Sequence, residues 1–325
     1  MRKNLMEYND GEEMEILVMI KESKMRTSKN GKPYLILNFS DASGTIRGNY
    51  WDATKEDAQR YASGTVVELN GKREEYQDHP QIKIFSMRVV GENEGYDFSQ
   101  FVKSAPIKRE NLEETINKRV FEILNPTWNR IVRYLLKKWN QEFFTFPAGK
   151  SNHHAVRGGL AFHTVTMLKD AEGITNTYPQ VDRSLLYAGC ILHDMGKVLE
   201  LSGPVATKYT TEGNLIGHLV LIDEQIILAA KELQLDPEAE DVVLLRHMVL
   251  SHHGLPEYGA ARRPALLEAE LLHMIDDMDA TIYAITRALQ YTKPGYFTDI
   301  IPSQDNRRFY RPKQDEAIDN SQKLE

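Results

Sequence analysis

The hydrophobic periodicity of this chain changes once, near residue 100, and this change most limits what the chain can fold into. Residues 12–90 contain short apolar runs with alternating polar residues, separated by turn-forming Gly, Asn, Asp and Ser. Such runs predict strands, because successive side chains of a strand point to opposite faces. From Glu110 onward the apolar residues recur at helical spacing, without an intervening strand pattern. We therefore expect an all-β module followed by an all-α module.

The first module has the element order of an OB-fold barrel, which is five strands with one short helix between the third and the fourth. The turn at Asp41–Gly44 and the glycines Gly64 and Gly71 separate these elements. The strands are expected at Glu15–Ile20, Tyr34–Phe39, Thr45–Trp51, Thr65–Asn70 and Gln81–Val90, and the helix at Thr54–Tyr61.

Three side chains of this module suit a single-stranded nucleic acid. Tyr34 and Trp51 lie on the second and third strands, the usual binding face of the fold, and Arg47 lies on the third strand. We predict all three as substrate-binding residues. An aromatic residue at such a position can instead belong to the barrel core, and an OB-fold can also bind another protein.

The second module is predicted to be helical throughout. The predicted domains are an OB-fold at residues 1–95, a linker at 96–109, a helical domain at 110–302 and a disordered tail at 303–325. A first helix carries Leu112, Ile116 and Val120 at helical spacing. The following helices are expected at Pro126–Trp139, Leu160–Asn176, Arg183–Met195, Leu215–Leu233, Pro237–Ser251 and Pro264–Gln290, with Asp236 as the N-cap of the fifth of these.

Composition indicates a cytoplasmic protein without a membrane partner. No apolar run approaches the roughly 20 residues that span a bilayer, and the first residues lack the apolar segment of a secretory signal. The single cysteine, Cys190, fits a reducing compartment. Net charge is −7, yet residues 101–157 carry 11 Lys and Arg against 5 Asp and Glu. This basic segment is either a track for phosphates or a solvated helical face.

The strongest functional signal is an ordered set of histidines and aspartates in otherwise apolar helices. One helical histidine alone is more often a surface or core residue than a ligand, but here several helices each contribute a ligand type. Imidazole and carboxylate without thiolate suit Mn, Fe, Co or Zn. A carboxylate in an adjacent His-Asp pair can bridge two cations, and two metals stabilise both oxygens of an in-line phosphoryl displacement. The candidate ligands are His163, His193, Asp194, His218, His252, His253 and Asp276.

The order His163, His193-Asp194, Asp276 resembles the HD superfamily of metal-dependent phosphohydrolases, and His-Asp-Met-Gly-Lys resembles its HDxGK form. With an OB-fold ahead of it and the phrases FPAGKSNHHAVRGGLAFHT and LSHHG, the chain resembles the YhaM family of 3′-to-5′ exoribonucleases. This resemblance covers nearly the whole chain apart from its two ends.

The resemblance implies a role for each matching residue. His163, His193, Asp194 and Asp276 would hold a first metal, and Asp194 would bridge to a second metal completed by His218 and His252. His253 competes with His252, and spacing does not decide between them. Asp276 is preferred to Asp277 because it takes the first position of the family's Asp-x-x-Asp-Ala pattern. Asp279 would not bind the metal itself but would orient one of its ligands. Lys197 would face the substrate phosphate, and Lys197 and Asp194 are the expected catalytic residues.

The implied activity is hydrolysis of single-stranded RNA, and of single-stranded DNA as a second substrate, to nucleoside 5′-monophosphates. The implied cofactors are two divalent metal ions, with Mn²⁺ expected and Co²⁺, Fe²⁺, Zn²⁺ and Mg²⁺ compatible with the same ligands. Lys150, His154 and Arg157 are candidate substrate-binding residues in the preceding loop. The rival functions are an HD-type nucleotidase or cyclic-dinucleotide phosphodiesterase, and a DNA-binding protein that uses the OB-fold. A homo-oligomer built through the helical half is also open.

Overall fold

The computed structural model describes residues 3–28, 30–76, 79–91, 94–96, 100–101, 104–149, 156–205 and 207–314. The chain divides into two compact units, residues 1–104 and residues 105–325. The first unit is a closed five-stranded barrel and the second is helical, which confirms the predicted fold class.

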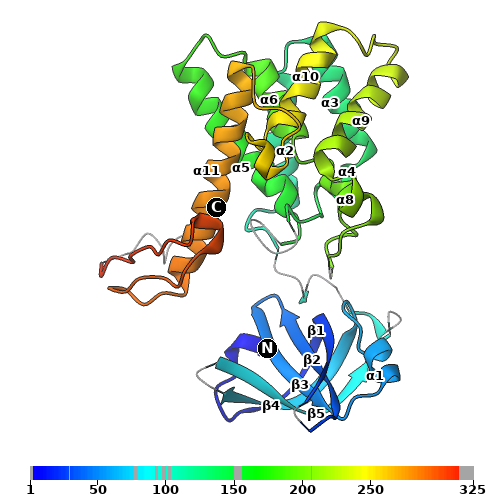
Figure 1. The fold of residues 1–325 in the computed structure, drawn as a ribbon, viewed down its shortest axis with the longest axis vertical. Helices are drawn as coiled ribbons and strands as arrows, with labels where there is room; N and C mark the ends of the chain where they lie inside the picture. The colour runs from blue at the N-terminus through cyan, green and yellow to red at the C-terminus, as the bar shows by residue number, and fades with distance from the viewer. Residues whose placement is uncertain are drawn as a thin grey trace. The chain divides into compact units, whose positions relative to one another are not determined.

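The barrel closes in the strand order β1-β2-β3-β5-β4, and its short helix lies between β3 and β4 in sequence, as in an OB-fold (Figure 1). Its strands pair antiparallel except for β3 and β5, which pair in parallel. Phe39 and Leu69 are fully buried inside it. The elements are β1 (Glu13–Thr27), β2 (Pro33–Asp41), β3 (Gly44–Trp51), α1 (Lys55–Arg60), β4 (Val66–Tyr76) and β5 (His79–Val89).

Two strands are longer than their apolar patterns predict. β1 pairs with β4 through its first half and with β2 through its second half, with an irregularity between Ile20 and Glu22. The second half is mostly exposed and charged, so it lacks the alternation by which a strand is recognised. β4 likewise continues past Gly71, because this glycine marks an irregularity in the β4–β5 pairing and not the end of the strand.

Part of the predicted linker belongs to the barrel unit. Phe101 is buried and its ring packs edge-on against Tyr96. The amide of Ala42 donates to the carbonyl of Gln100 at 2.9 Å, and the Ser40 hydroxyl lies 3.4 Å from the Phe101 carbonyl. The chain therefore still contacts the barrel at residue 101, although its composition there is that of a linker.

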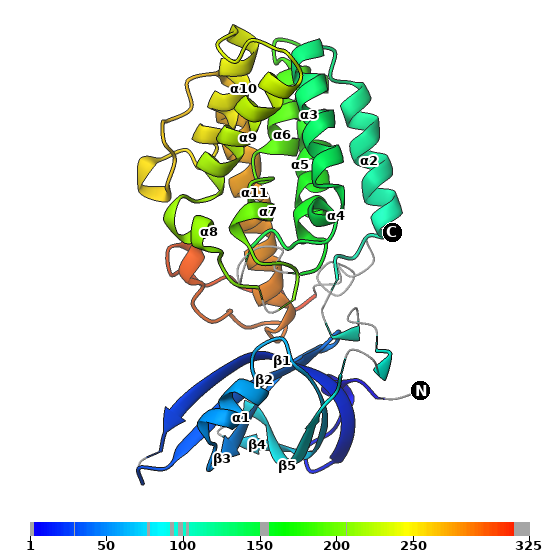
Figure 2. The same cartoon turned by 90° about the vertical axis from the view of Figure 1, so that its right-hand side faces the viewer.

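In the helical unit, α6 is the central helix, because it contacts α2, α3, α5, α10 and α11 (Figure 2). Nearly all of its residues are buried, which explains its apolar sequence. No described helix is long and apolar enough to cross a membrane. The helices are α2 (Arg109–Phe121), α3 (Pro126–Lys138), α4 (Asn140–Phe143), α5 (Gly159–Thr177), α6 (Arg183–Leu192), α7 (Lys197–Glu200), α8 (Thr211–Leu215), α9 (His218–Glu232), α10 (Glu240–Ser251) and α11 (Leu267–Gln290).

Three helix boundaries differ from the sequence-based expectation. The helix predicted from Leu215 is interrupted at Gly217, whose φ of 81° lies in the left-handed region that favours glycine. The helix predicted from Pro237 begins at Glu240, because the Asp236 carboxylate accepts from the Glu238 amide at 2.9 Å and closes a turn ahead of the helix. α6 ends at Leu192 and not at Met195, so the following His-Asp pair lies beyond the helix.

The prediction of a disordered tail is wrong for residues 303–314. Short bridges join Phe297 to Tyr310 and Ile301 to Arg307. The buried Arg311 guanidinium donates to the Thr292 carbonyl at 2.8 Å, just past the end of α11. Cationic side chains often bind the unpaired carbonyls near a helix end in this way. The polar composition of the segment does not reveal such a contact, so the sequence did not predict its order. Residues 315–325 lie outside the described residues.

Replacing Phe39 by alanine tests the barrel core. We expect a loss of about 3–5 kcal/mol in barrel stability, the usual cost of removing a buried phenylalanine ring. Hydrogen exchange of barrel amides in the full chain measures this, with α6 amides as an internal reference. Phe85→Ala, which removes a half-exposed ring from β5, is the control and should change little. Equal effects of the two substitutions would contradict this core.

Candidate metal centre

The His193-Asp194 pair lies in the turn between α6 and α7, directly after the last residue of α6. Neighbours on a regular helix point about 100° apart, so a continuing helix would separate the two side chains. Here the Asp194 carboxylate is 3.4 Å from the His193 Nε2 atom, and both residues are buried. The turn directs both groups into the same interior space.

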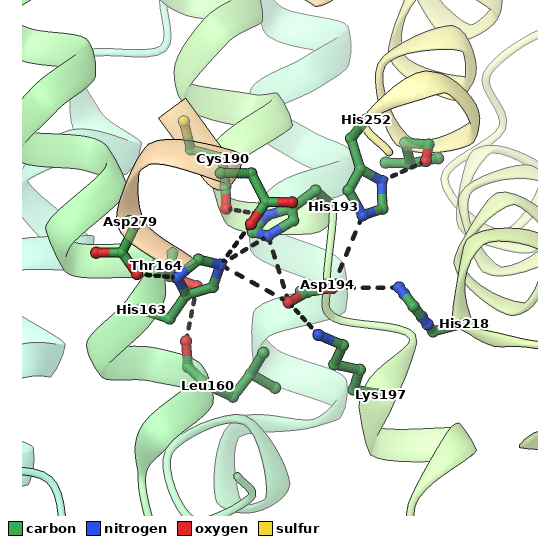
Figure 3. Close-up of polar contacts among 12 residues, drawn as sticks. Leu160, His163, Thr164, Cys190, His193, Asp194, Lys197, His218, His252 and Asp279 are labelled. Atoms are coloured by element: carbon green, nitrogen blue, oxygen red, sulfur yellow. Dashed lines mark hydrogen bonds and ion pairs between the residues drawn. The ribbon is translucent and has the colours of Figure 1, made fainter. Parts of the chain in front are cut away.

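The two oxygens of the Asp194 carboxylate face two different groups of imidazoles (Figure 3). Oδ2 lies 3.4 Å from His193 Nε2 and 3.8 Å from His163 Nε2. Oδ1 lies 3.3 Å from His218 Nε2 and 3.8 Å from His252 Nε2. The carboxylate therefore stands between two sets of imidazole nitrogens, an arrangement that would suit a bridging ligand.

The first group combines His163 from α5, His193 and Asp276 from α11. Asp276 Oδ1 lies 3.1 Å from His163 Nε2, and the Nε2 atoms of His163 and His193 are 3.3 Å apart. Asp277 is exposed on the same helix. Together with Asp194, this group offers two imidazoles and two carboxylates.

The second group contains His218, His252 and His253. Their ligand atoms lie within 4.8 Å of one another, and the ring centroids of His252 and His253 are 4.4 Å apart. His218 is the first residue of α9, while the other two follow α10 directly. Sequence spacing leaves His252 and His253 as alternatives, but the geometry brings both to the same place.

All five histidines use Nδ1 for a contact behind the ring, which leaves Nε2 to face the centre. His163 Nδ1 lies 2.6 Å from Asp279 Oδ2, and His218 Nδ1 lies 3.0 Å from Glu200 Oε1. The Nδ1 atoms of His193, His252 and His253 contact the carbonyls of Cys190, Val249 and Tyr258 at 2.9, 2.7 and 2.8 Å. Such contacts fix the orientation of metal-binding imidazoles.

Burial and neighbouring charges shift the pKa values of His163 and Asp194 in opposite directions. Burial alone would lower the pKa of His163, but the Asp276 and Asp279 carboxylates raise it to about 10. Burial would raise the pKa of Asp194, yet the Lys197 ammonium 2.5 Å away and His193 hold it well below its usual range. The buried carboxylates and the positive or ionisable groups around them thus favour each other's charged forms.

The second group fits a metal cation on chemical grounds. Burial, together with His193 and His253, holds the pKa of His252 well below its ordinary value, so this ring is neutral. Because the Val249 carbonyl can only accept, the ring hydrogen is on Nδ1, and the Nε2 lone pair faces Asp194 Oδ1. Among the described residues, neither His218 Nε2 nor His252 Nε2 has a hydrogen-bond partner. A cation between the His252 lone pair and the Asp194 carboxylate would satisfy both.

The other candidate residues are not all part of this centre. Lys197 contacts Asp194 and is buried, but Lys150 and His154 lie outside the described residues. The backbone carbonyl of Arg157 accepts from the amide of Ala105, and its side chain is half-buried. In the barrel, the Tyr34 and Trp51 rings stack 4.8 Å apart, and Arg47 is exposed near Asn49.

Two residues of the centre were missed by sequence reasoning. Glu200 binds His218 from behind, and Gly196 allows the backbone of the turn to approach His218. A Cβ atom on Gly196 would lie 2.2 Å from the His218 carbonyl oxygen. The glycine of His-Asp-Met-Gly-Lys was a visible signal, whereas nothing in the sequence pairs Glu200 with a histidine 18 residues later.

Comparison with known proteins assigns this centre to a family. The HD domain family matches residues 160–281, a range that contains all the candidate ligands. The chain is also 44% identical over 312 residues to the 3′-5′ exoribonuclease YhaM of Bacillus licheniformis, covering 96% of this chain and 99% of that protein. The chain belongs to the YhaM family. It is therefore an enzyme, a metal-dependent phosphodiesterase of the HD type.

Gly196→Ala tests whether close backbone packing sets the position of His218. The added methyl group must displace the first residue of α9, so we expect the variant to retain less Mn²⁺ per chain than the wild type. Metal analysis after gel filtration measures this. Gly173→Ala is the control, since a Cβ there meets no atom within 4 Å. Wild-type metal content in Gly196→Ala would show that His218 does not need this packing.

Proposed function

We propose that this enzyme degrades single-stranded RNA from its 3′ end to nucleoside 5′-monophosphates, by a hydrolysis that uses two divalent metal ions. The position of Asp194 carries this proposal, since each of its oxygens faces a separate group of imidazoles. Similarity to a 3′-5′ exoribonuclease over nearly the whole chain supports both the RNA substrate and its degradation from the 3′ end.

The metal ligands divide between the two groups. His163, His193 and Asp276 would hold one ion and His218, His252 and His253 the other, with Asp194 shared. When bound, such a pair lowers the pKa of a water molecule and offsets the charge that develops on the phosphoryl oxygens. Mn²⁺ is the proposed ion, and Co²⁺, Fe²⁺, Zn²⁺ and Mg²⁺ are alternatives that the same ligands accept.

The protein's own groups position these ligands and the strand. Asp279 holds the His163 ring at Nδ1, so that Nε2 is turned toward the centre. The Lys197 ammonium lies on the Asp194 carboxylate, and its flexible stem allows it to bind a non-bridging oxygen of the terminal phosphate. Arg157, together with Lys150 and His154 in the same loop, is proposed to bind the RNA phosphates next to the terminal one.

The barrel supplies a surface for the unpaired strand. The Trp51 ring is 60% exposed and stacks on Tyr34, so one of its faces is available to a nucleobase. Arg47 is exposed on the same strand, β3, as Trp51. Stacking on aromatic rings and contacts with cations bind single strands without sequence preference. A free nucleotide would need no such surface, which favours a strand over the mononucleotide substrates of other HD enzymes.

A cytoplasmic location and a homo-oligomer stay predictions.

The proposal is tested with 5′-labelled single-stranded RNA and Mn²⁺. Wild-type protein should give a ladder that shortens from the 3′ end, and Asp194→Asn should lower the rate by at least about 100-fold, the scale of losing one key electrostatic group. Binding of RNA by the variant should be largely retained.

Asp276→Asn and Asp277→Asn form a matched pair for the same assay. The two residues are neighbours on α11, but only Asp276 contacts His163. Only Asp276→Asn should lose activity. Turnover by Asp194→Asn at the wild-type rate would contradict the proposal, and so would intact RNA beside hydrolysed free nucleotides. Single-stranded DNA in parallel reactions tests the second substrate.

Trp51→Ala tests the barrel surface in the Asp194→Asn background, where bound RNA is not degraded. Stacking of one base contributes about 1–3 kcal/mol, so we expect the Kd for a fluorescent single-stranded RNA to rise by about 5–150-fold. Fluorescence anisotropy measures the Kd. Trp51→Phe, which keeps an aromatic ring, should bind much closer to the parent. Unchanged affinity in Trp51→Ala would exclude this residue from the RNA-binding surface.

A further inference from the structure

We propose that Glu200 is a positioning residue that sets the affinity of one of the two metal ions, the one held by His218, His252 and His253. This inference rests on the proposed two-metal function and deepens it. Glu200 is buried on the short helix α7, six residues after Asp194, and it contacts no other candidate ligand than His218 among the described residues.

One oxygen of the Glu200 carboxylate holds both the ring and the backbone of His218. Oε1 lies 3.0 Å from His218 Nδ1 and accepts from the His218 amide at 3.2 Å. Because His218 is the first residue of α9, its amide is one of those that the helix itself leaves unpaired. The carboxylate thus fixes where α9 begins and how the imidazole is rotated.

The backbone of Glu200 is itself held in place. Its carbonyl accepts from the Thr210 amide at 2.9 Å and lies 3.2 Å from the Thr210 hydroxyl. A Cβ atom on Gly213 would lie 2.2 Å from the same carbonyl oxygen, so only glycine fits there. A bridge between Leu201 and Tyr209 closes the connection from α7 to α8. The backbone that carries the Glu200 side chain is therefore held in place independently of His218.

The arrangement is matched on the other side of Asp194. His163 has the Asp279 carboxylate behind its ring, whereas the Nδ1 atoms of His193, His252 and His253 contact backbone carbonyls in the part of the chain that the structure describes. Each metal position thus includes one histidine backed by a negative charge. A carboxylate behind an imidazole strengthens the ring as a ligand more than a neutral carbonyl does. Glu200 and Asp279 should then act on different ions.

A purely structural role for Glu200 predicts a different result. If the carboxylate only caps α9, its loss would destabilise the metal-free chain and weaken both metal positions together. If it acts through His218, its loss would weaken one binding event, and excess metal would restore activity. Glu200→Gln separates these cases, because glutamine keeps the size and one acceptor oxygen but removes the charge.

The experiment is calorimetric titration of the metal-free full-length chain with Mn²⁺, together with RNA hydrolysis across a range of Mn²⁺ concentrations. Glu200→Gln should weaken one of two binding events by about 10–100-fold, the usual effect of removing such a partner, and leave the other within about twofold. Activity should return at high Mn²⁺. Asp279→Asn should weaken the other event, and Glu200→Asp, which keeps the charge on a shorter side chain, should lie between Glu200→Gln and the wild type.

Two results would overturn the inference while two-metal binding stands. One is unchanged affinity for both ions in Glu200→Gln. The other is an equal loss at both positions with a lower unfolding temperature of the metal-free variant and no rescue by Mn²⁺. A wild-type chain that binds fewer than two Mn²⁺ ions would instead contradict the two-metal function on which the inference rests.

Discussion

The buried carboxylate of Asp194 is the group on which the rest of the helical unit depends. Taking a carboxylate out of water costs several kcal/mol unless cations or hydrogen-bond donors surround it. In this chain its partners are the Lys197 ammonium and Nε2 atoms that converge from several separate places in the sequence. The fold therefore has to bring α5, the α6–α7 turn, the start of α9 and the end of α10 together around one side chain.

The helices meet this requirement by local means. The apolar α6 passes through the middle of the unit and ends one residue before His193, so the pair emerges inside the core. Gly196 then lets the backbone of this turn pack closely against His218, and Gly217, in the left-handed region, lets α9 begin at His218. Contacts behind the rings hold each imidazole in one orientation, which would position the proposed metal ligands. Preorganisation of this kind is what two-metal hydrolysis requires of a protein.

Much of this arrangement could be predicted from the sequence, because the barrel strands and the candidate metal ligands each have a strong local pattern. Alternating residues such as Leu35, Leu37 and Phe39 identify the barrel, and the ligand types identify the centre. Features that depend on contacts distant in the sequence could not be predicted. The Glu200–His218 contact, the ordered segment around Arg311 and the charged second half of β1 all depend on partners that local composition does not reveal. The choice between His252 and His253 was open for the same reason, since spacing alone does not show that both rings converge.

The central claim is that Asp194 is shared by two metal ions, and anomalous diffraction from crystals of the full chain grown with Mn²⁺ tests it most directly. We predict two anomalous peaks about 3.5–4 Å apart, one beside each oxygen of Asp194. One peak should lie near His163 and Asp276, and the other near His218 and His252. A single peak, or two peaks of which neither is bound by Asp194, would contradict the account.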